Sequence, residues 1–185
     1  MPDPSRLPLP FPIVDSPEAI QYNFDALADA FPVIAQWKPQ SGLAQATGTI
    51  TTLTSVAQDV PGCSLSFTPA VNSVAMIWGT FDFELAGSSD STFDYIAHGR
   101  LQVNGVTQSQ YAELRLLRSI TGTPTLGTEA TVSQFWRISL PARALTTVKL
   151  VVVGTIANGT GTGSTMSCLG GGNAGTELAY FVHAA

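Results

Sequence analysis

The stretch VNSVAMIWGTFDFEL, residues 71–85, decides the fold class of this chain. It is long and rich in β-branched and aromatic side chains, which indicates a strand, and Gly79 marks a position where that strand can bend. Other runs of strand type are separated by turn signals and cover residues 47–57, 62–67, 95–103, 111–119, 130–140, 146–156 and 177–184. We therefore predict a mainly β fold with about eight strands and no helix after residue 45. This spacing is typical of an antiparallel sandwich or barrel, and the jelly roll is the natural eight-strand sandwich.

The segments between the predicted strands carry clear turn chemistry. Asn104-Gly105 is the strongest short hairpin signal in the chain. Residues 158–175 are rich in Gly, Ser and Thr, and we expect a loop there, of a length that is usually functional or mobile. Helical patterns do not alternate with the predicted strands, which excludes a nucleotide-binding α/β fold.

The N-terminal part of the chain differs in kind from the β region. We divide the sequence into an extended Pro-rich arm (1–15), a short helix (16–31), a linker (32–45) and the β-sandwich head (46–185). Prolines within the arm favour extended backbone. A disordered tail is one reading of the arm, but a solvent linker does not need the apolar side chains that this one has. An arm lying in a groove of another protein would use them: Leu7, Leu9, Phe11, Ile13 and Val14.

Residues 16–31 have the signals of a short helix. Ser16 suits the N-cap, Pro17 the first turn and Glu18 the positive end of the helix dipole, and Pro32 ends the segment. The apolar residues have the spacing of a coiled-coil seam: Ile20, Phe24, Leu27 and Phe31. A helix of about 15 residues is marginal alone in water. It must pack on its own domain, on sister helices or on another protein, and its position outside the β region favours the last two.

Charge is scarce in this protein. Charged residues make up 11% of the chain, against about 25% in ordinary domains, and the net charge is −5. No Lys/Arg-rich stripe is present, so nucleic acid is not an expected partner. No apolar run approaches the length of a membrane span, and residues 1–12 lack the features of a cleavable signal peptide, so we expect synthesis in the cytoplasm without membrane insertion. Such low charge suggests that part of the surface is covered by something other than solvent: serine, threonine and glycine can form a neutral surface, but subunit contacts would serve as well.

The sequence contains no recognisable catalytic constellation. His98 and His183 belong to no metal-binding spacing, and Asp82 and Glu84 on one strand face are better explained as solvent-facing neighbours of core residues than as an acid pair. No nucleophile elbow or phosphate-binding loop is present. We therefore predict neither a metal nor another cofactor and interpret the chain as a binding or structural module rather than an enzyme.

The two cysteines, Cys63 and Cys168, are too few for a disulfide scaffold or a four-cysteine metal site. In a chain without an export signal, two buried free thiols are the simplest interpretation.

Two regions together resemble small virion proteins of tailed bacteriophages. The stretch PLPFPIVDSPEAIQYNFDALADAF (8–31) resembles the starting segment of phage minor tail proteins and fibres, and the residues that carry the resemblance are Ser16, Pro17, Glu18, Ala19, Ile20, Gln21, Asn23, Phe24 and Leu27. The stretches SLSFTPAVNSVAMIWGTFDFEL (64–85), GRLQVNGV (99–106), TTVKLVVVG (146–154) and AYFVHA (179–184) resemble trimeric jelly-roll heads of the tumour-necrosis-factor type.

This resemblance implies a homotrimer on a virion, held to other virion proteins of the tail, baseplate or capsid through residues 1–31. It implies a fibre or minor tail protein that contacts the host surface, or alternatively a capsid decoration protein or head fibre. A polysaccharide-cleaving spike and a cellular lectin-like module are the remaining alternatives. Contact with a host glycan or protein would use the tips of three loops, with candidates Ser88, Ser89, Asp90, Thr123, Thr125, Asn158, Thr160 and Asn173.

The helical seam predicts a measurable effect on assembly. Phe24→Asp places a charge on the apolar stripe, so we expect the oligomer to weaken and the mass in sedimentation to fall. An unchanged oligomer mass at the same protein concentration would refute the seam.

Overall fold

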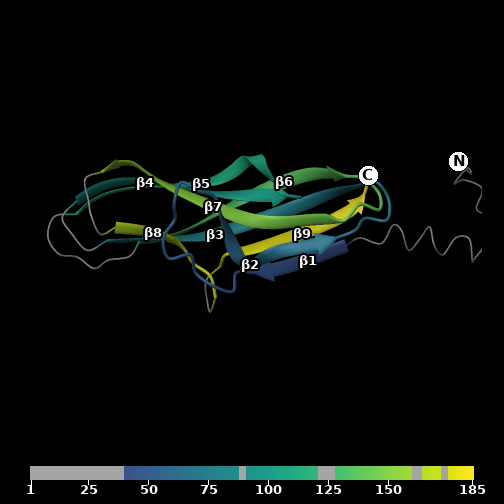
Figure 1. The fold of residues 1–185 in the computed structure, drawn as a ribbon, viewed down its shortest axis with the longest axis horizontal. Coiled ribbons are helices and arrows are strands. Elements are labelled where there is room, and N and C mark those ends of the chain that lie inside the picture. Colours follow the sequence, from purple (N-terminus) through teal and green to yellow (C-terminus); the bar gives the residue numbers. More distant parts are fainter. Residues whose placement is uncertain (1–39, 88–90, 121–127, 160–163, 172–174) are drawn as a thin grey trace, which may run out of the picture. The chain divides into compact units, whose positions relative to one another are not determined.

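The computed structural model describes residues 40–87, 91–120, 128–159, 164–171 and 175–185 (Figure 1). By its contacts the chain divides after Lys38, and all described residues belong to the second unit, Pro39–Ala185. The predicted arm, its five apolar residues, the predicted helix and its four seam residues therefore lie outside the described residues.

The described part of the chain consists of strands and their connections. The strands are β1 (Gln40–Gln45), β2 (Gln58–Phe67), β3 (Ser73–Gly87), β4 (Ser91–Val103), β5 (Val106–Ile120), β6 (Thr128–Leu140), β7 (Thr146–Gly159), β8 (Ser164–Cys168) and β9 (Glu177–Ala184). This confirms the prediction of a mainly β chain, and no α-helix occurs among the residues that the structure describes.

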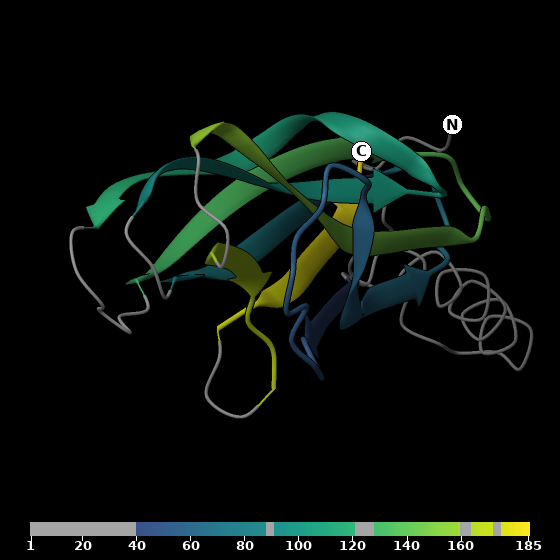
Figure 2. The same ribbon diagram turned by 60° about the vertical axis from the view of Figure 1, so that its left-hand side comes forward.

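The strands form two antiparallel sheets that face each other (Figure 2). The first sheet has the order β1-β9-β3-β6, and β8 pairs with β3 as well. The second sheet has the order β2-β7-β4-β5. β3 is the spine of the first sheet, because β6 pairs with one of its edges while β9 and then β8 pair with successive parts of the other.

The core lies between the sheets and is built by alternation along each strand. In β3, every second residue from Ala75 to Leu85 points inward, as expected when one face of a strand is buried. The second sheet contributes inward-facing residues of β4 and β7. The largest fully buried side chains are Trp136, Phe81, Phe83, Ile77, Leu85, Leu101 and Leu150. Trp136 also donates a hydrogen bond from Nε1 to the carbonyl of Gln110 in β5, 2.9 Å away, which satisfies its polar atom.

The hairpin predicted at Asn104-Gly105 is confirmed. It joins β4 to β5, and both residues have positive φ, 50° and 81°, which is the backbone that a two-residue hairpin turn requires. The Asn104 side chain adds a second function, since its carbonyl oxygen accepts a hydrogen bond from the backbone N–H of Thr147 at 2.8 Å.

The structure corrects the sequence prediction at three places. Residues 40–45, expected within a linker, form β1, which pairs along its whole length with the edge of β9. Residues 164–168, expected within a loop, form β8, which pairs with the edge of β3 beyond the end of β9. Both segments become strands because each pairs with the free edge of a neighbouring strand. Their own residues do not indicate this pairing.

The third correction concerns residues 47–57, which are not the predicted strand. Ile50 exchanges backbone hydrogen bonds with Cys168 at 2.9 and 3.0 Å, and the Thr54 carbonyl accepts one from Gly154 at 2.8 Å. The segment therefore crosses from β8 in the first sheet to β7 in the second. Since its backbone bonds to both sheets, it runs across the side of the sandwich and belongs to neither.

Close packing across the sandwich predicts one stability effect. Gly99 of β4 faces the ring of Phe81, and an added Cβ would overlap that fully buried ring. We expect Gly99→Ala to lower the free energy of unfolding by about 1–3 kcal/mol through overpacking.

The matched control is Gly175→Ala, because a Cβ added at Gly175 meets nothing within 4 Å. Urea denaturation of both variants tests the packing, and equal stability of the two would contradict it.

Candidate interaction surface

The outer face of the first sheet carries an apolar row that runs from one edge of the sheet to the other. Leu43 of β1 lies opposite Ala179 of β9, Ala179 lies opposite Trp78 of β3, and Trp78 lies opposite Phe135 of β6. These four positions occupy the four strands in order. Their side chains share the outer face because their neighbours along each strand point into the core.

A second row beside it extends the apolar surface. In that row Phe181 of β9 lies opposite Met76 of β3. We name the six residues of the two rows the apolar face: Leu43, Met76, Trp78, Phe135, Ala179 and Phe181.

Four members of the apolar face have large side chains that are exposed to solvent. The exposed fractions are 59% for Leu43, 44% for Trp78, 39% for Phe135 and 37% for Phe181. The rings of Trp78 and Phe135 contact each other with centroids 5.2 Å apart. Single exposed apolar residues are common, and here the contact between Trp78 and Phe135 joins two of them into one patch.

Polar and charged residues continue the rows of the apolar face. Arg137 lies opposite Met76, in the second row itself, and His183 lies opposite Val74 in the next row. In the other direction along the strands, Glu177 of β9 lies opposite Thr80 of β3. Further along β3, Glu84 lies directly opposite Glu129 of β6. The outer face of the first sheet thus has one arginine in its apolar rows and carboxylates further along the strands.

Asp82, considered from the sequence as one of two carboxylates on a strand face, holds a loop in place. Its Oδ1 accepts a hydrogen bond from Thr131 at 2.9 Å and its Oδ2 one from the backbone N–H of Gly175 at 3.3 Å. Its backbone N–H donates to Thr176 Oγ1 and its carbonyl accepts from Leu169 N–H. Asp82 therefore holds both ends of the connection between β8 and β9, with its carboxylate at Gly175 and its backbone carbonyl at Leu169.

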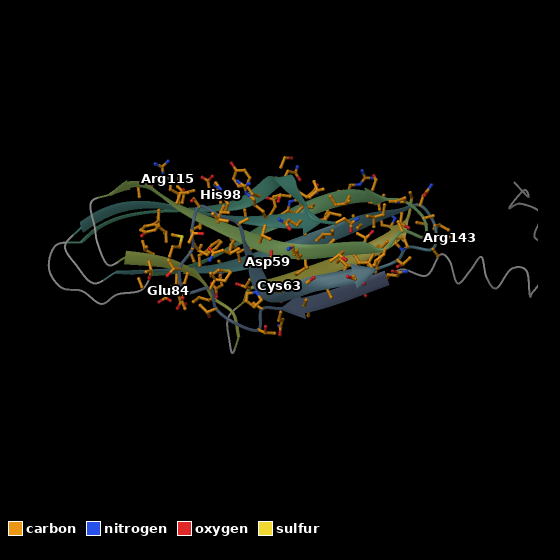
Figure 3. The ribbon with its side chains drawn as sticks, in the orientation of Figure 1. Asp59, Cys63, Glu84, His98, Arg115 and Arg143 are labelled. Atoms are coloured by element: carbon orange, nitrogen blue, oxygen red, sulfur yellow. The ribbon has the colours of Figure 1, made fainter. Side chains whose placement is uncertain are left out.

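The outer face of the second sheet carries pairs of opposite charge. Lys149 pairs with Asp59 at 2.7 Å, and Arg115 donates to Asp94 from Nε at 2.8 Å. The hydrogen bonds from Arg115, more than its charge alone, hold the pKa of the Asp94 carboxyl below its usual range. Figure 3 shows Arg115 pointing away from the sandwich on this side and Glu84 on the opposite side.

Both histidines are engaged in local contacts rather than in a site. His98 Nε2 lies 3.1 Å from Glu113, and its Nδ1 lies 3.4 Å from Nη2 of Arg100, whose guanidinium lies over the ring of Tyr111. His183 Nδ1 donates to the carbonyl of Ala184 at 2.7 Å. Within the described ranges, no three His, Cys, Asp or Glu side chains are grouped so that they could hold a metal ion. No helix in that part of the chain has the length and apolar character to span a membrane.

Seven of the eight candidate receptor-loop residues lie outside the described residues: Ser88, Ser89, Asp90, Thr123, Thr125, Thr160 and Asn173. The backbone of Asn158 belongs to β7, where it pairs with Asp94 of β4, so this residue stands in a strand and not in the expected loop. The apolar face was not predicted, because the strand 71–85 is apolar at positions on both of its faces.

Comparisons with known proteins identify no family. No family model and no curated protein matches the chain. Among solved structures, "Eiger TNF from S. frugiperda" is similar to it with 12% identity and a TM-score of 0.39, and the match covers 80% of this chain and 93% of that one. A chain of infectious bursal disease virus, Gt strain, is similar with 14% identity and a TM-score of 0.41, over 80% of this chain but only 38% of the viral one.

The two thiols are free and buried, and this gives a chemical prediction. Burial raises the pKa of Cys63 to about 11 and that of Cys168 to about 12. Since the thiolate is the reactive form and neither sulfur is accessible, we expect iodoacetamide at pH 8 to leave the native protein unmodified.

In denaturant, the same iodoacetamide treatment should alkylate both cysteines. Intact-mass measurement detects the added mass. A native adduct at either position would contradict the burial.

Proposed function

We propose that this chain is a non-enzymatic structural protein of a bacteriophage virion, a homotrimeric fibre or minor tail protein with a jelly-roll head. The observation that carries the proposal is the exposed apolar face in a chain with only 11% charged residues. A surface of this kind suits contact with proteins, whereas a small-molecule site is concave and has convergent polar groups.

The connectivity of the strands supports the jelly-roll assignment. The chain visits the first sheet with β1, the second with β2, the first with β3 and the second with β4 and β5. It then returns to the first sheet with β6, crosses to the second with β7 and ends in the first with β8 and β9. Repeated crossing between two antiparallel layers, here of five and four strands, is typical of a double Greek key.

The engagement of the ionisable side chains supports a structural role. Asp94 and Asp59 are paired with cations of their own sheet, and Asp82 binds backbone groups of a loop. Glu84, the second carboxylate considered from the sequence, faces Glu129 across the strand pair. These carboxylates serve the fold and its surface, and we assign none of them to catalysis.

The N-terminal segments complete the proposal. Residues 1–15 anchor the protein to other virion proteins through Leu7, Leu9, Phe11, Ile13 and Val14, and the seam of residues 16–31 contributes to oligomer contacts. A trimer would bring three copies of this short helix together, which explains how two heptads suffice. The head then presents its loop tips to a host-surface glycan or protein, and the protein resides in the virion.

Deleting residues 1–15 tests the anchoring role. We expect the shortened chain to give the circular dichroism spectrum and melting temperature of the full chain, because the described sandwich begins at β1. We also expect it to be absent from purified particles, whereas the full chain co-purifies with them.

A length-matched control keeps all prolines and replaces Leu9, Phe11 and Ile13 by Ser; loss of incorporation in this variant as well assigns anchoring to the apolar side chains. Normal incorporation of the shortened chain would overturn the proposal. Immunogold labelling of particles distinguishes a tail position from a capsid decoration.

A further inference from the structure

We propose that Arg100 and Tyr111, on the outer face of the second sheet, bind the carboxylate and the ring of an acidic sugar. The inference rests on the proposed function in one respect, namely that the head contacts a host-surface glycan. It adds the chemical class of that glycan and a binding surface on the strands, in addition to the loop tips.

Arg100 is a cation without a carboxylate partner. The other two cations whose side chains the structure describes on this face, Lys149 and Arg115, each pair with an aspartate. No carboxylate of the described residues lies within ion-pair distance of Arg100. A guanidinium stays charged at physiological pH and presents a planar fork of donors that matches a carboxylate. Arg100 is therefore the group on this face that an added carboxylate would satisfy.

The guanidinium of Arg100 is held in place by its neighbours. Its Cζ lies 5.2 Å from the centroid of the Tyr111 ring, and its Nη2 lies 3.4 Å from Nδ1 of His98. Arginine only donates, so Nδ1 accepts this bond and the ring proton of His98 sits on Nε2, where Glu113 receives it at 3.1 Å. His98 and Glu113 thus position Arg100 and do not themselves bind the ligand.

The terminal nitrogens of Arg100 are the ones that a ligand reaches. Nε is buried and has no hydrogen-bond partner in the described part of the chain. Nη2 gives one of its two hydrogens to His98, while Nη1 has no partner among the described residues and is not buried. A carboxylate therefore approaches the end of the guanidinium, where two parallel charge-assisted hydrogen bonds can form with Nη1 and Nη2.

The surroundings of Arg100 favour a sugar over a bare anion. Tyr111 lies directly opposite Arg100 in β5, and its ring is 41% exposed, so it offers apolar area to one face of a sugar ring. Beside it the register of β4 and β5 shifts, and Leu101 faces the three residues Gln-Ser-Gln at 108–110. Such bulges re-aim side chains and are frequent next to functional sites. The ring thus supplies apolar contact, and the bulge supplies polar groups for hydroxyls.

A single site of this kind binds weakly, because it offers few contacts to set against the cost of association. Three copies of the site in a trimer would bind one polymeric glycan together. The second and third contacts are then intramolecular, which raises the overall affinity without any new contact.

The test titrates the full chain with glucuronate and follows the backbone amides by NMR. Glucuronate carries both a carboxylate and a sugar ring, whereas glucose lacks the carboxylate and acetate lacks the ring. We expect glucuronate to shift the amides of β4 and β5 around Arg100 and Tyr111. We expect its dissociation constant to be about tenfold lower than that of glucose or acetate, since a hydrogen bond to a charged group supplies a factor of this size.

Two matched variants locate the charge. Arg100→Gln removes the charge from the site, and Arg143→Gln removes the same charge from an exposed arginine that also has no ion pair among the described residues. Figure 3 shows Arg143 at one end of the sandwich, away from His98. We expect Arg100→Gln to raise the dissociation constant of glucuronate at least about tenfold and Arg143→Gln to leave it unchanged.

Tyr111→Ala provides a further variant in case Arg100→Gln does not fold, because the Tyr111 side chain is exposed. We expect it to raise the dissociation constant of glucuronate about threefold or more, the size of a lost aromatic contact, and to leave that of acetate unchanged.

Three results would overturn the inference. The first is the absence of shifts around Arg100 at the highest glucuronate concentration. The second is acetate that binds as tightly as glucuronate, which would assign Arg100 to a carboxylate of a protein segment. The third is equal weakening by Arg143→Gln, which would be a general effect of charge.

The proposed function has its own readout, which is incorporation into particles. A chain that enters particles but does not bind glucuronate would overturn this inference alone. A chain that binds glucuronate but never enters particles would overturn the proposed function alone.

Discussion

The arrangement of this domain depends on the hydrogen bonding of β3 along both of its edges. β6 pairs with residues 73–85 on one side, while β9 pairs with residues 73–80 and β8 with residues 83–87 on the other. Between β8 and β9 the chain leaves the sheet, and the backbone N–H and carbonyl of Asp82 bond to Thr176 and Leu169 across that gap. Every backbone group of a central strand needs such a partner, since an unpaired buried group costs about as much free energy as a lost hydrogen bond.

Pairing on both edges fixes the register of β3, and the register decides which side chains are buried. Ile77, Phe81 and Phe83 face the core, whereas Met76 and Trp78 face outward. A slip by one residue would exchange the two sets, placing Trp78 in the core and Phe81 in water. Gly99 adds a further constraint from the second sheet, because only a residue without a Cβ leaves room for the ring of Phe81.

The sequence was sufficient to predict those elements whose own residues favour them. The hairpin at Asn104-Gly105 and the long strand 71–85 are specified by local turn chemistry and by β propensity, and both occur. β1 and β8 could not be predicted, because QSGLAQ and STMSC become strands only where β9 and β3 offer free edges. The Thr-rich segment 47–57 has strand character, yet its backbone bonds to both sheets. Predicting the apolar face required the strand order, since Leu43, Trp78 and Phe135 come together only in the folded sheet.

The scarcity of charge acquires a structural meaning from the difference between the two outer faces. The Lys149–Asp59 and Arg115–Asp94 ion pairs of the described residues both lie on the second sheet, where His98 also contacts Glu113. The first sheet instead exposes aromatic rings, with Arg137 in the row of Met76 and no ion pair among its described residues. Leaving such a surface in water costs about 25 cal/mol for each Å² of apolar area. Burial of those rings by another protein would recover that free energy. The two outer faces therefore differ in what their side chains do: ion pairs join neighbouring strands on the second sheet, and aromatic rings face solvent on the first.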